Sequence, residues 1–159
     1  MGSRRRGREF ALQALYQADI AGTPVSAAFA GLWPGALEGD GLLTEGHVPE
    51  SDEVEFAQRL AFGVETQRQR LDDLIEECSI NWRVPRMPAV DRNILRLAAF
   101  ELADCTDIPG TVAINESIEL AKKYGTGESK SFVNGIVDKL ARTLGRVEGA
   151  KRRTTGGDT

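Results

Sequence analysis

Four arginines stand within five positions near the start of the chain, with no acidic residue among them: Arg4, Arg5, Arg6 and Arg8. The guanidinium group is a planar donor fork that can bind a phosphate or stack on a flat ring. Arginines at the beginning of a helix oppose its macrodipole, so helix stability does not explain them. A phosphate backbone would offset that unfavourable placement. A solvated helix start is the alternative interpretation.

Gln13 and Tyr16 share one face with Arg6 if residues 4–20 form a helix, because the spacings are seven and three. Proteins read single-stranded RNA by stacking aromatic rings on its bases and by polar contacts to the base edges. An aromatic ring beside arginines suits that chemistry. The alternative is that Tyr16 is a half-buried tyrosine of the core.

A second basic and aromatic cluster is predicted near residues 128–144. Val133, Ile136 and Leu140 form the apolar line of an expected helix, which leaves Phe132 at the edge of that line. Lys130 and Asn134 are its neighbours, and two further lysines close the preceding expected helix. The alternative is that Phe132 packs in the core.

Asp91, Arg92 and Arg96 are expected on the solvent-exposed face of a helix over residues 89–104. A solvated face without a partner is the default interpretation of such charges. Asn115 and Glu116, on the next expected helix, are interpreted as organising helix packing.

No catalytic constellation, metal site or cofactor is predicted. His47 is the single histidine, and Cys78 and Cys105 lack the CxxC spacing. The cysteines are interpreted as reduced, buried thiols. The chain has no P-loop and no GxGxxG motif, and its carboxylates lie on separate expected helices without a nearby base. The protein is therefore expected to be no enzyme and to take no small-molecule substrate.

Helical periodicity dominates the chain, and no alternating strand pattern is convincing, so the expected fold class is all-α. Pro85 and Pro88 bracket a linker over 79–88, which predicts two three-helix-bundle-like subdomains, residues 1–80 and 86–145. A Gly- and Pro-rich stretch over 34–50 predicts a flexible loop, and the polar residues 146–159 predict a disordered tail. The six expected helices cover 4–20, 24–32, 51–77, 89–104, 111–124 and 128–144.

The net charge of −4 at first argues against a nucleic-acid partner. The distribution changes that interpretation, because no lysine or arginine occurs from residue 9 to residue 58, whereas both ends of the chain are basic. A local basic patch can bind phosphate on an otherwise acidic surface. No apolar run is long enough to span a membrane and no signal peptide is visible, so the expected location is the cytoplasm.

Four stretches together resemble the NusB family: RRRGREFALQALYQAD, MPAVDRNILRLAAFEL, IPGTVAINESIELAKKYGT and ESKSFVNGIVDKL. The resemblance covers nearly the whole chain except 34–50, where this loop is longer and richer in glycine than in compact members, and the tail. It implies an all-helical fold of two subdomains. It also implies a transcription antitermination factor that binds the boxA element of nascent ribosomal RNA together with the ribosomal protein NusE, within the RNA polymerase antitermination complex.

The resemblance also implies roles for particular residues. The RNA-binding residues would be Arg4, Arg5, Arg6, Arg8, Gln13, Tyr16, Lys130, Phe132 and Asn134. The partner-binding residues would be Asp91, Arg92, Arg96 and Glu128. Two other functions stay open at this point: a NusB-like domain of the kind found in ribosomal RNA cytosine methyltransferases, and a protein-interaction bundle without an RNA role.

Overall fold

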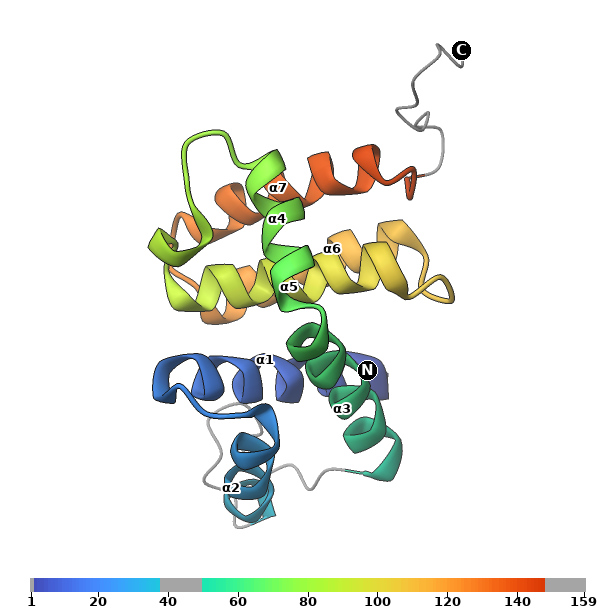
Figure 1. Cartoon of the computed structure of the whole chain (residues 1–159). Coiled ribbons are helices and arrows are strands. Elements are labelled where there is room, and N and C mark those ends of the chain that lie inside the picture. The colour runs from blue at the N-terminus through green and yellow to red at the C-terminus, as the bar shows by residue number, and fades with distance from the viewer. Residues whose placement is uncertain (1, 38–49, 148–159) are drawn as a thin grey trace. The chain divides into compact units, whose positions relative to one another are not determined.

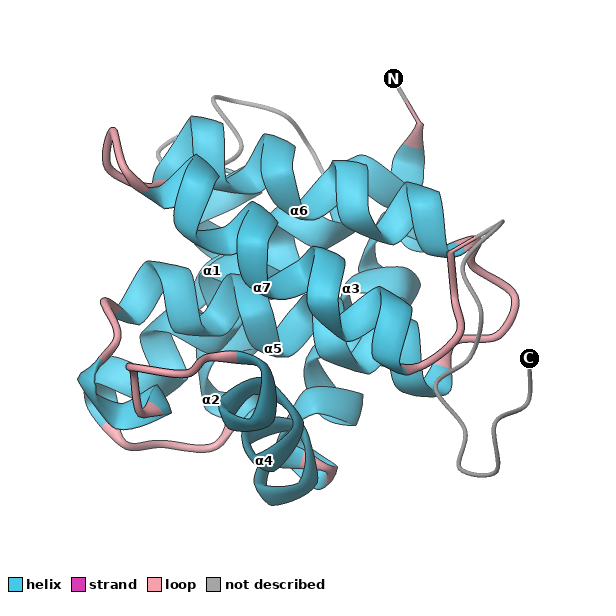
Figure 2. Cartoon of the chain, turned by 90° about the horizontal axis from the view of Figure 1, so that it is seen from above, coloured by secondary structure: helices cyan, strands magenta, loops and turns pink. Residues whose placement is uncertain are grey.

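The computed structural model describes residues 2–37 and 50–147, and within these ranges it contains helices and no strand (Figures 1 and 2). The prediction of an all-α fold is confirmed. The helices are α1 (Ser3–Ala21), α2 (Val25–Leu37), α3 (Ser51–Thr66), α4 (Arg68–Cys78), α5 (Ala89–Asp104), α6 (Gly110–Tyr124) and α7 (Ser129–Thr143), with a 3₁₀ turn η1 (Val84–Arg86). No helix in the described ranges is both long enough and apolar enough to cross a membrane.

The chain divides into two compact units, Met1–Thr66 and Gln67–Thr159. The sequence predicted one helix over 51–77 and a junction at 79–88, and both expectations differ from the structure. The helix breaks at Gln67, whose backbone leaves the helical region at φ −104° and ψ 16°. The following helix α4 packs against α5 and α7, so it belongs to the second unit, which therefore has four described helices.

The first unit is built by packing α1 along α3, with α2 against α1. Phe10 and Leu60 are among its fully buried side chains. Helix α1 ends at Gly22, which has a left-handed backbone at φ 69° and donates its N–H to the carbonyl of Ala18. Helix α2 extends to Leu37, beyond the predicted end at residue 32, and residues 38–49 of the predicted 34–50 loop lie outside the described residues.

The second unit is organised around α5, which packs against α4, α6 and α7. Its core includes the fully buried side chains Leu71, Ile94, Leu102 and Leu140. The unit closes at Arg146, whose guanidinium donates to the backbone carbonyls of Glu101, Leu102, Cys105 and Ile108. The predicted tail over 146–159 is therefore wrong at its first residue, since Arg146 caps the end of α5, and residues 148–159 lie outside the described ranges.

Candidate nucleic-acid interface

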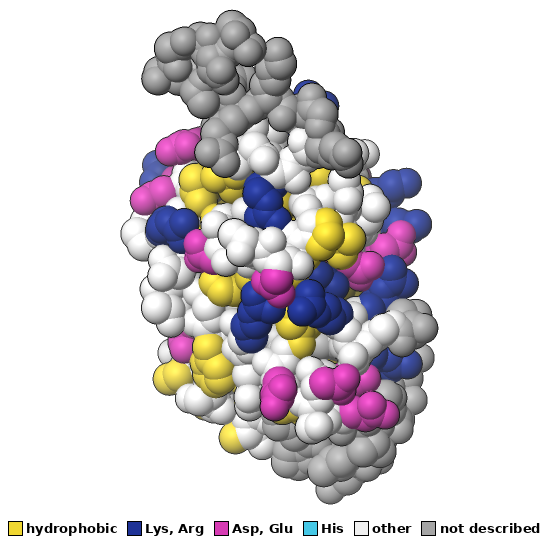
Figure 3. Space-filling view, turned by 90° about the vertical axis from the view of Figure 1, so that its right-hand side faces the viewer, with side chains coloured by type: hydrophobic (Ala, Val, Ile, Leu, Met, Phe, Trp, Pro, Cys, Tyr) yellow, Lys and Arg dark blue, Asp and Glu magenta, His cyan; other side chains and the backbone are white. Residues whose placement is uncertain are grey.

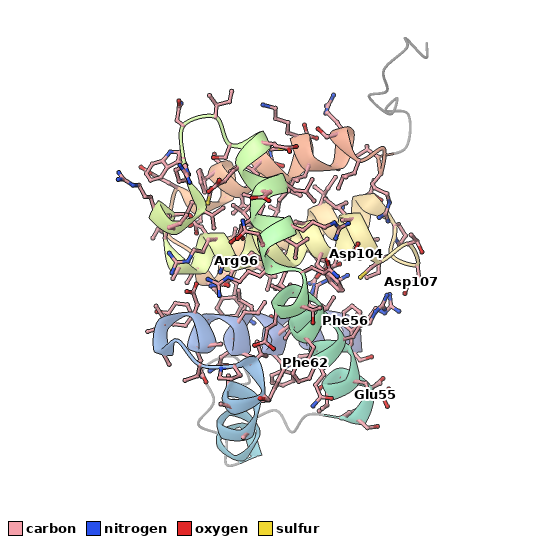
Figure 4. The ribbon with its side chains drawn as sticks, viewed as in Figure 1. Glu55, Phe56, Phe62, Arg96, Asp104 and Asp107 are labelled. Carbon is pink, nitrogen blue, oxygen red and sulfur yellow. The ribbon has the colours of Figure 1, made fainter. Side chains whose placement is uncertain are left out.

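The arginines of α1 meet α3 at one aromatic ring, Phe56 (labelled in Figure 4). The guanidinium carbon of Arg4 lies 4.8 Å from the ring centroid, and that of Arg8 lies at 5.3 Å. Arg59 of α3 approaches the same ring at 5.9 Å. A side chain at Gly7 would place its Cβ 2.9 Å from a ring carbon of Phe56, so glycine is what lets the two helices approach here. The result is a concentrated basic surface at the start of α1.

The predicted RNA-binding residues of this surface differ in exposure. Arg4 is exposed, and Arg5 and Arg6 are half-buried. Arg8 lies one turn after Arg4 on the same face, and it is buried against α3 with its guanidinium over Phe56. Arg8 therefore holds the helix start in place, and the other three arginines form the accessible part.

Gln13 and Tyr16 were expected together on a polar face of α1, and the structure separates them. Every residue from Gly7 to Leu15 is buried, so this stretch of helix has no solvent-exposed face. Gln13 is buried with them, and its Oε1 has no hydrogen-bond partner among the described residues. Tyr16 follows where the burial ends and is 39% exposed. Of these two residues, only Tyr16 is exposed to solvent.

Phe132 of α7 packs against an aromatic ring that the sequence analysis did not single out, Trp82. The ring centroids are 6.1 Å apart and the planes meet at 75°, an edge-to-face arrangement. A hollow of about 140 Å³ opens beside the two rings and is lined by Trp82, Pro88, Asp91, Thr126, Glu128 and Phe132. In the sequence, the feature that could have pointed to Trp82 is its place as an aromatic residue in the arginine-rich stretch 82–86. Lys130 and Asn134 are exposed on α7.

A polar network underlies this hollow. The hydroxyl of Ser129 donates to Oδ1 of Asp91 at 2.7 Å, and the backbone N–H of Thr126 donates to that hydroxyl oxygen at 2.9 Å. Asp91 is buried, so its predicted place on the solvent-exposed face of α5 is wrong. The carboxylate ties the start of α5 to the start of α7.

Arg96, labelled in Figure 4, was also expected on the exposed face of α5, and that expectation is wrong. Every residue from Asn93 to Ala99 is buried, Arg96 included. Its Nε donates to Oδ1 of Asp72 at 2.8 Å and its Nη2 to Oδ2 at 3.1 Å. Arg92 is half-buried, and its Nη1 donates to the carbonyls of Pro85 and Met87. These two arginines brace α4 and η1 against α5.

Glu128 is exposed, just before α7. On the face drawn in Figure 3, lysine and arginine side chains are interspersed with acidic ones.

Within the described residues, no group of three His, Cys, Asp or Glu side chains could hold a metal ion. Cys78 and Cys105 are both buried thiols, and burial raises the pKa of Cys78. His47 lies outside the described residues.

The family model described as the NusB family matches residues 5–142, which is most of the chain. The chain belongs to the NusB family. The transcription antitermination protein NusB of Myxococcus xanthus (strain DK1622) is 45% identical over 146 residues, covering 92% of this chain and 99% of that protein. The NusB of Desulfatibacillum aliphaticivorans is 40% identical over 153 residues, covering 96% and 99%. The resemblance found in the sequence is confirmed.

Solved NusB structures share the fold. A structure of T. maritima NusB superposes with a TM-score of 0.73 at 34% identity and covers 93% of each chain. A crystal structure of the antitermination factors NusB and NusE in complex with dsRNA gives a TM-score of 0.75 at 24% identity, covering 90% of this chain and 98% of the other. The curated NusB relatives are named as transcription antitermination proteins, which agrees with the expectation of a non-enzymatic factor.

Proposed function

We propose that this chain is an antitermination factor that binds boxA-type RNA of nascent ribosomal RNA transcripts together with the ribosomal protein NusE, within the RNA polymerase antitermination complex in the cytoplasm. The observation that carries the proposal is the arginine surface at the start of α1, anchored on Phe56 by Arg8. The solved complex of a NusB with NusE and dsRNA supports the same pairing of partners.

Two surfaces bind RNA in this proposal, one on each unit. Arg4, Arg5 and Arg6 supply phosphate contacts and Tyr16 supplies a stacking ring, while Arg8 and Gln13 are buried and support the helix from within. The second surface consists of Lys130, Phe132 and Asn134 on α7. A few phosphate contacts and one or two stacked rings give modest affinity at physiological salt.

The phosphate contacts are tested by replacing Arg5 and Arg6 together with alanine and titrating labelled boxA RNA over a range of salt. Each lost contact to single-stranded RNA lowers the slope of log affinity against log salt by roughly 0.7, so the double variant should flatten it by roughly 1.4. A matched control replaces Arg68 and Arg142, both exposed and each paired with a carboxylate. An unchanged slope in the α1 variant would remove α1 from the RNA site.

Tyr16 tests base stacking in the same titration. Tyr16→Ala should weaken RNA binding by about 1–3 kcal/mol if its ring stacks on a base. Ile20→Ala is the control, because Ile20 lies one turn further along α1 and is also exposed. A loss of thermal stability without a loss of RNA affinity would assign Tyr16 to packing.

The partner surface is proposed around Glu128 and Arg92, the accessible members of the predicted set. Asp91 and Arg96 are buried, and their part is to hold α5, α7 and α4 in place. Ribosomal proteins are typically basic, so an exposed carboxylate suits NusE by charge complementarity. Coupling between two ligands is reciprocal, so bound NusE should raise RNA affinity by the factor by which RNA raises NusE affinity.

Glu128→Lys, titrated with NusE in the absence of RNA, tests this surface. The substitution should weaken NusE binding because it places like charge at the interface. Glu119→Lys, at an exposed position of α6, is the control and should leave NusE binding unchanged. Asp91→Lys is unsuitable, because Asp91 is buried and its loss would disturb Ser129. Unchanged NusE affinity in Glu128→Lys, or RNA affinity indifferent to saturating NusE, would contradict the proposal.

A further inference from the structure

We propose that Trp82 and Phe132 form the walls of a binding site for one nucleobase of single-stranded RNA, and that this site prefers a base with an exocyclic amino group. The inference rests on the proposed RNA-binding function and adds to it a residue, a subsite and a base preference.

The size and shape of the hollow fit one flat ring. Trp82 is 48% exposed and meets Phe132 edge to face, so the two rings form a corner rather than a closed stack. The hollow beside them measures about 140 Å³. A protein cavity of about 150 Å³ is known to hold one benzene ring, so a single base fits here and a longer stack does not. Aromatic walls of this kind bind bases by stacking.

The segment that carries Trp82 is held in place by hydrogen bonds. Glu76 accepts the backbone N–H of Val84 at 2.8 Å and the Nε of Arg83 at 3.4 Å through the same oxygen. Arg92 donates to the carbonyls of Pro85 and Met87 on the other side of the 3₁₀ turn. The backbone after Trp82 is therefore held and Phe132 contacts the Trp82 ring, which lowers the ordering cost of binding a flat ligand.

The polar lining supplies hydrogen-bond acceptors. Asp91 contributes a carboxylate that already accepts from Ser129, and Thr126 contributes a hydroxyl. Glu128 also lines the hollow, but it belongs to the proposed NusE surface. Carboxylates accept hydrogen bonds from the amino groups of adenine, cytosine and guanine, whereas uracil has no amino group. The same carboxylates repel a phosphate, so the base rather than the backbone enters the hollow. Exposed basic residues follow Trp82 in the chain, at Arg83 and Arg86, and Lys130 lies two residues before Phe132. These side chains can bind the phosphates on either side of the bound base.

The test uses the full chain and labelled boxA oligoribonucleotide, without NusE. Trp82→Leu should weaken RNA binding by roughly 5- to 150-fold, and Trp82→Phe should retain most of the affinity. Ile80→Ala is the matched control, because Ile80 is 82% exposed in the same segment but does not line the hollow. In a Trp33→Phe background Trp82 is the single tryptophan, and RNA should quench its fluorescence.

An abasic scan of the RNA locates the bound base. At one position, removing the base should weaken binding to the parent protein but not to Trp82→Leu, and uridine should weaken it where the natural base carries an amino group. Trp82→Leu binding as tightly as the parent, unquenched Trp82 fluorescence, or no such position in the scan would overturn the site. If Trp82→Leu fails to fold, the fluorescence of Trp82 in the folded Trp33→Phe protein decides, because that measurement leaves Trp82 unchanged.

Failure of this inference is distinguishable from failure of the proposed function. If replacing Arg5 and Arg6 weakens RNA binding while Trp82→Leu does not, the base site falls and the RNA-binding function stands. If the parent protein does not bind the RNA at all, both fall.

Discussion

The buried ion pair between Arg96 and Asp72 predicts a large loss of stability when one partner is removed. Two parallel N–H···O bonds of 2.8 and 3.1 Å join the groups, and the side chains are 4% and 18% exposed. Asp72→Ala leaves the guanidinium buried with Asn93 as a remaining acceptor. Breaking such a pair costs about 3–5 kcal/mol. Because Asp72 is partly exposed, we expect the lower end, about 3 kcal/mol.

A loss of that size should lower Tm by about 6–12 °C in a chain of this length. Thermal unfolding followed by circular dichroism measures it. Asp72→Ala combined with Arg96→Met removes both charges and should regain most of the lost stability, because an apolar side chain can replace a buried ion pair. Asp138→Ala, which breaks an exposed pair with Arg142, is the control and should cost below about 0.5 kcal/mol. Equal losses in Asp72→Ala and Asp138→Ala would refute the reasoning.

Three further predictions concern the second unit. Gly125→Ala should destabilise it by about 1–3 kcal/mol in urea unfolding, because the new Cβ would lie 2.4 Å from the side chain of Ser129, whereas Gly127→Ala meets nothing within 4 Å and should be neutral in packing. Arg146→Ala should lower the urea midpoint by removing the donor shared by four carbonyls at the end of α5, and an unchanged midpoint would contradict its capping role. Cys78 should react with iodoacetamide more slowly than a free peptide thiol at pH 8.5, because burial raises its pKa and lowers the thiolate fraction; an equal rate would contradict that shift.

Helix positions were the predictable part of the fold, because they depend on local apolar spacing. The helices over 89–104, 111–124 and 128–144 were placed within one or two residues of α5, α6 and α7. The break at Gln67 was not predictable in that way. Leu60, Val64 and Leu71 continue one helical stripe across it, with no glycine or proline between Val64 and Leu71. The chain turns there because α4 packs with α5 and α7, which is a tertiary effect.

The candidate site was predictable in composition but not in exposure. Residue type and spacing grouped the arginines of α1, and they grouped Phe132 with Lys130 and Asn134 on α7. Spacing along one helix shows a single buried stripe, however, and cannot show burial around a whole helix, which is why Gln13 and Arg96 were misplaced. Trp82 was overlooked because its packing on Phe132 joins segments far apart in the chain.

The Arg146 cap has a consequence for how the protein is made. Gly110 also lies against the backbone of Arg146, so both the end of α5 and the start of α6 depend on a residue after α7. The first unit ends at Thr66, 80 positions earlier. At about 5–20 residues per second, translation takes about 4–16 s to cover that interval. All residues of the first unit are therefore synthesised while α4, α5 and α6 still wait for their closing residue, and the apolar faces of these three helices are a part of the nascent chain that a chaperone would meet.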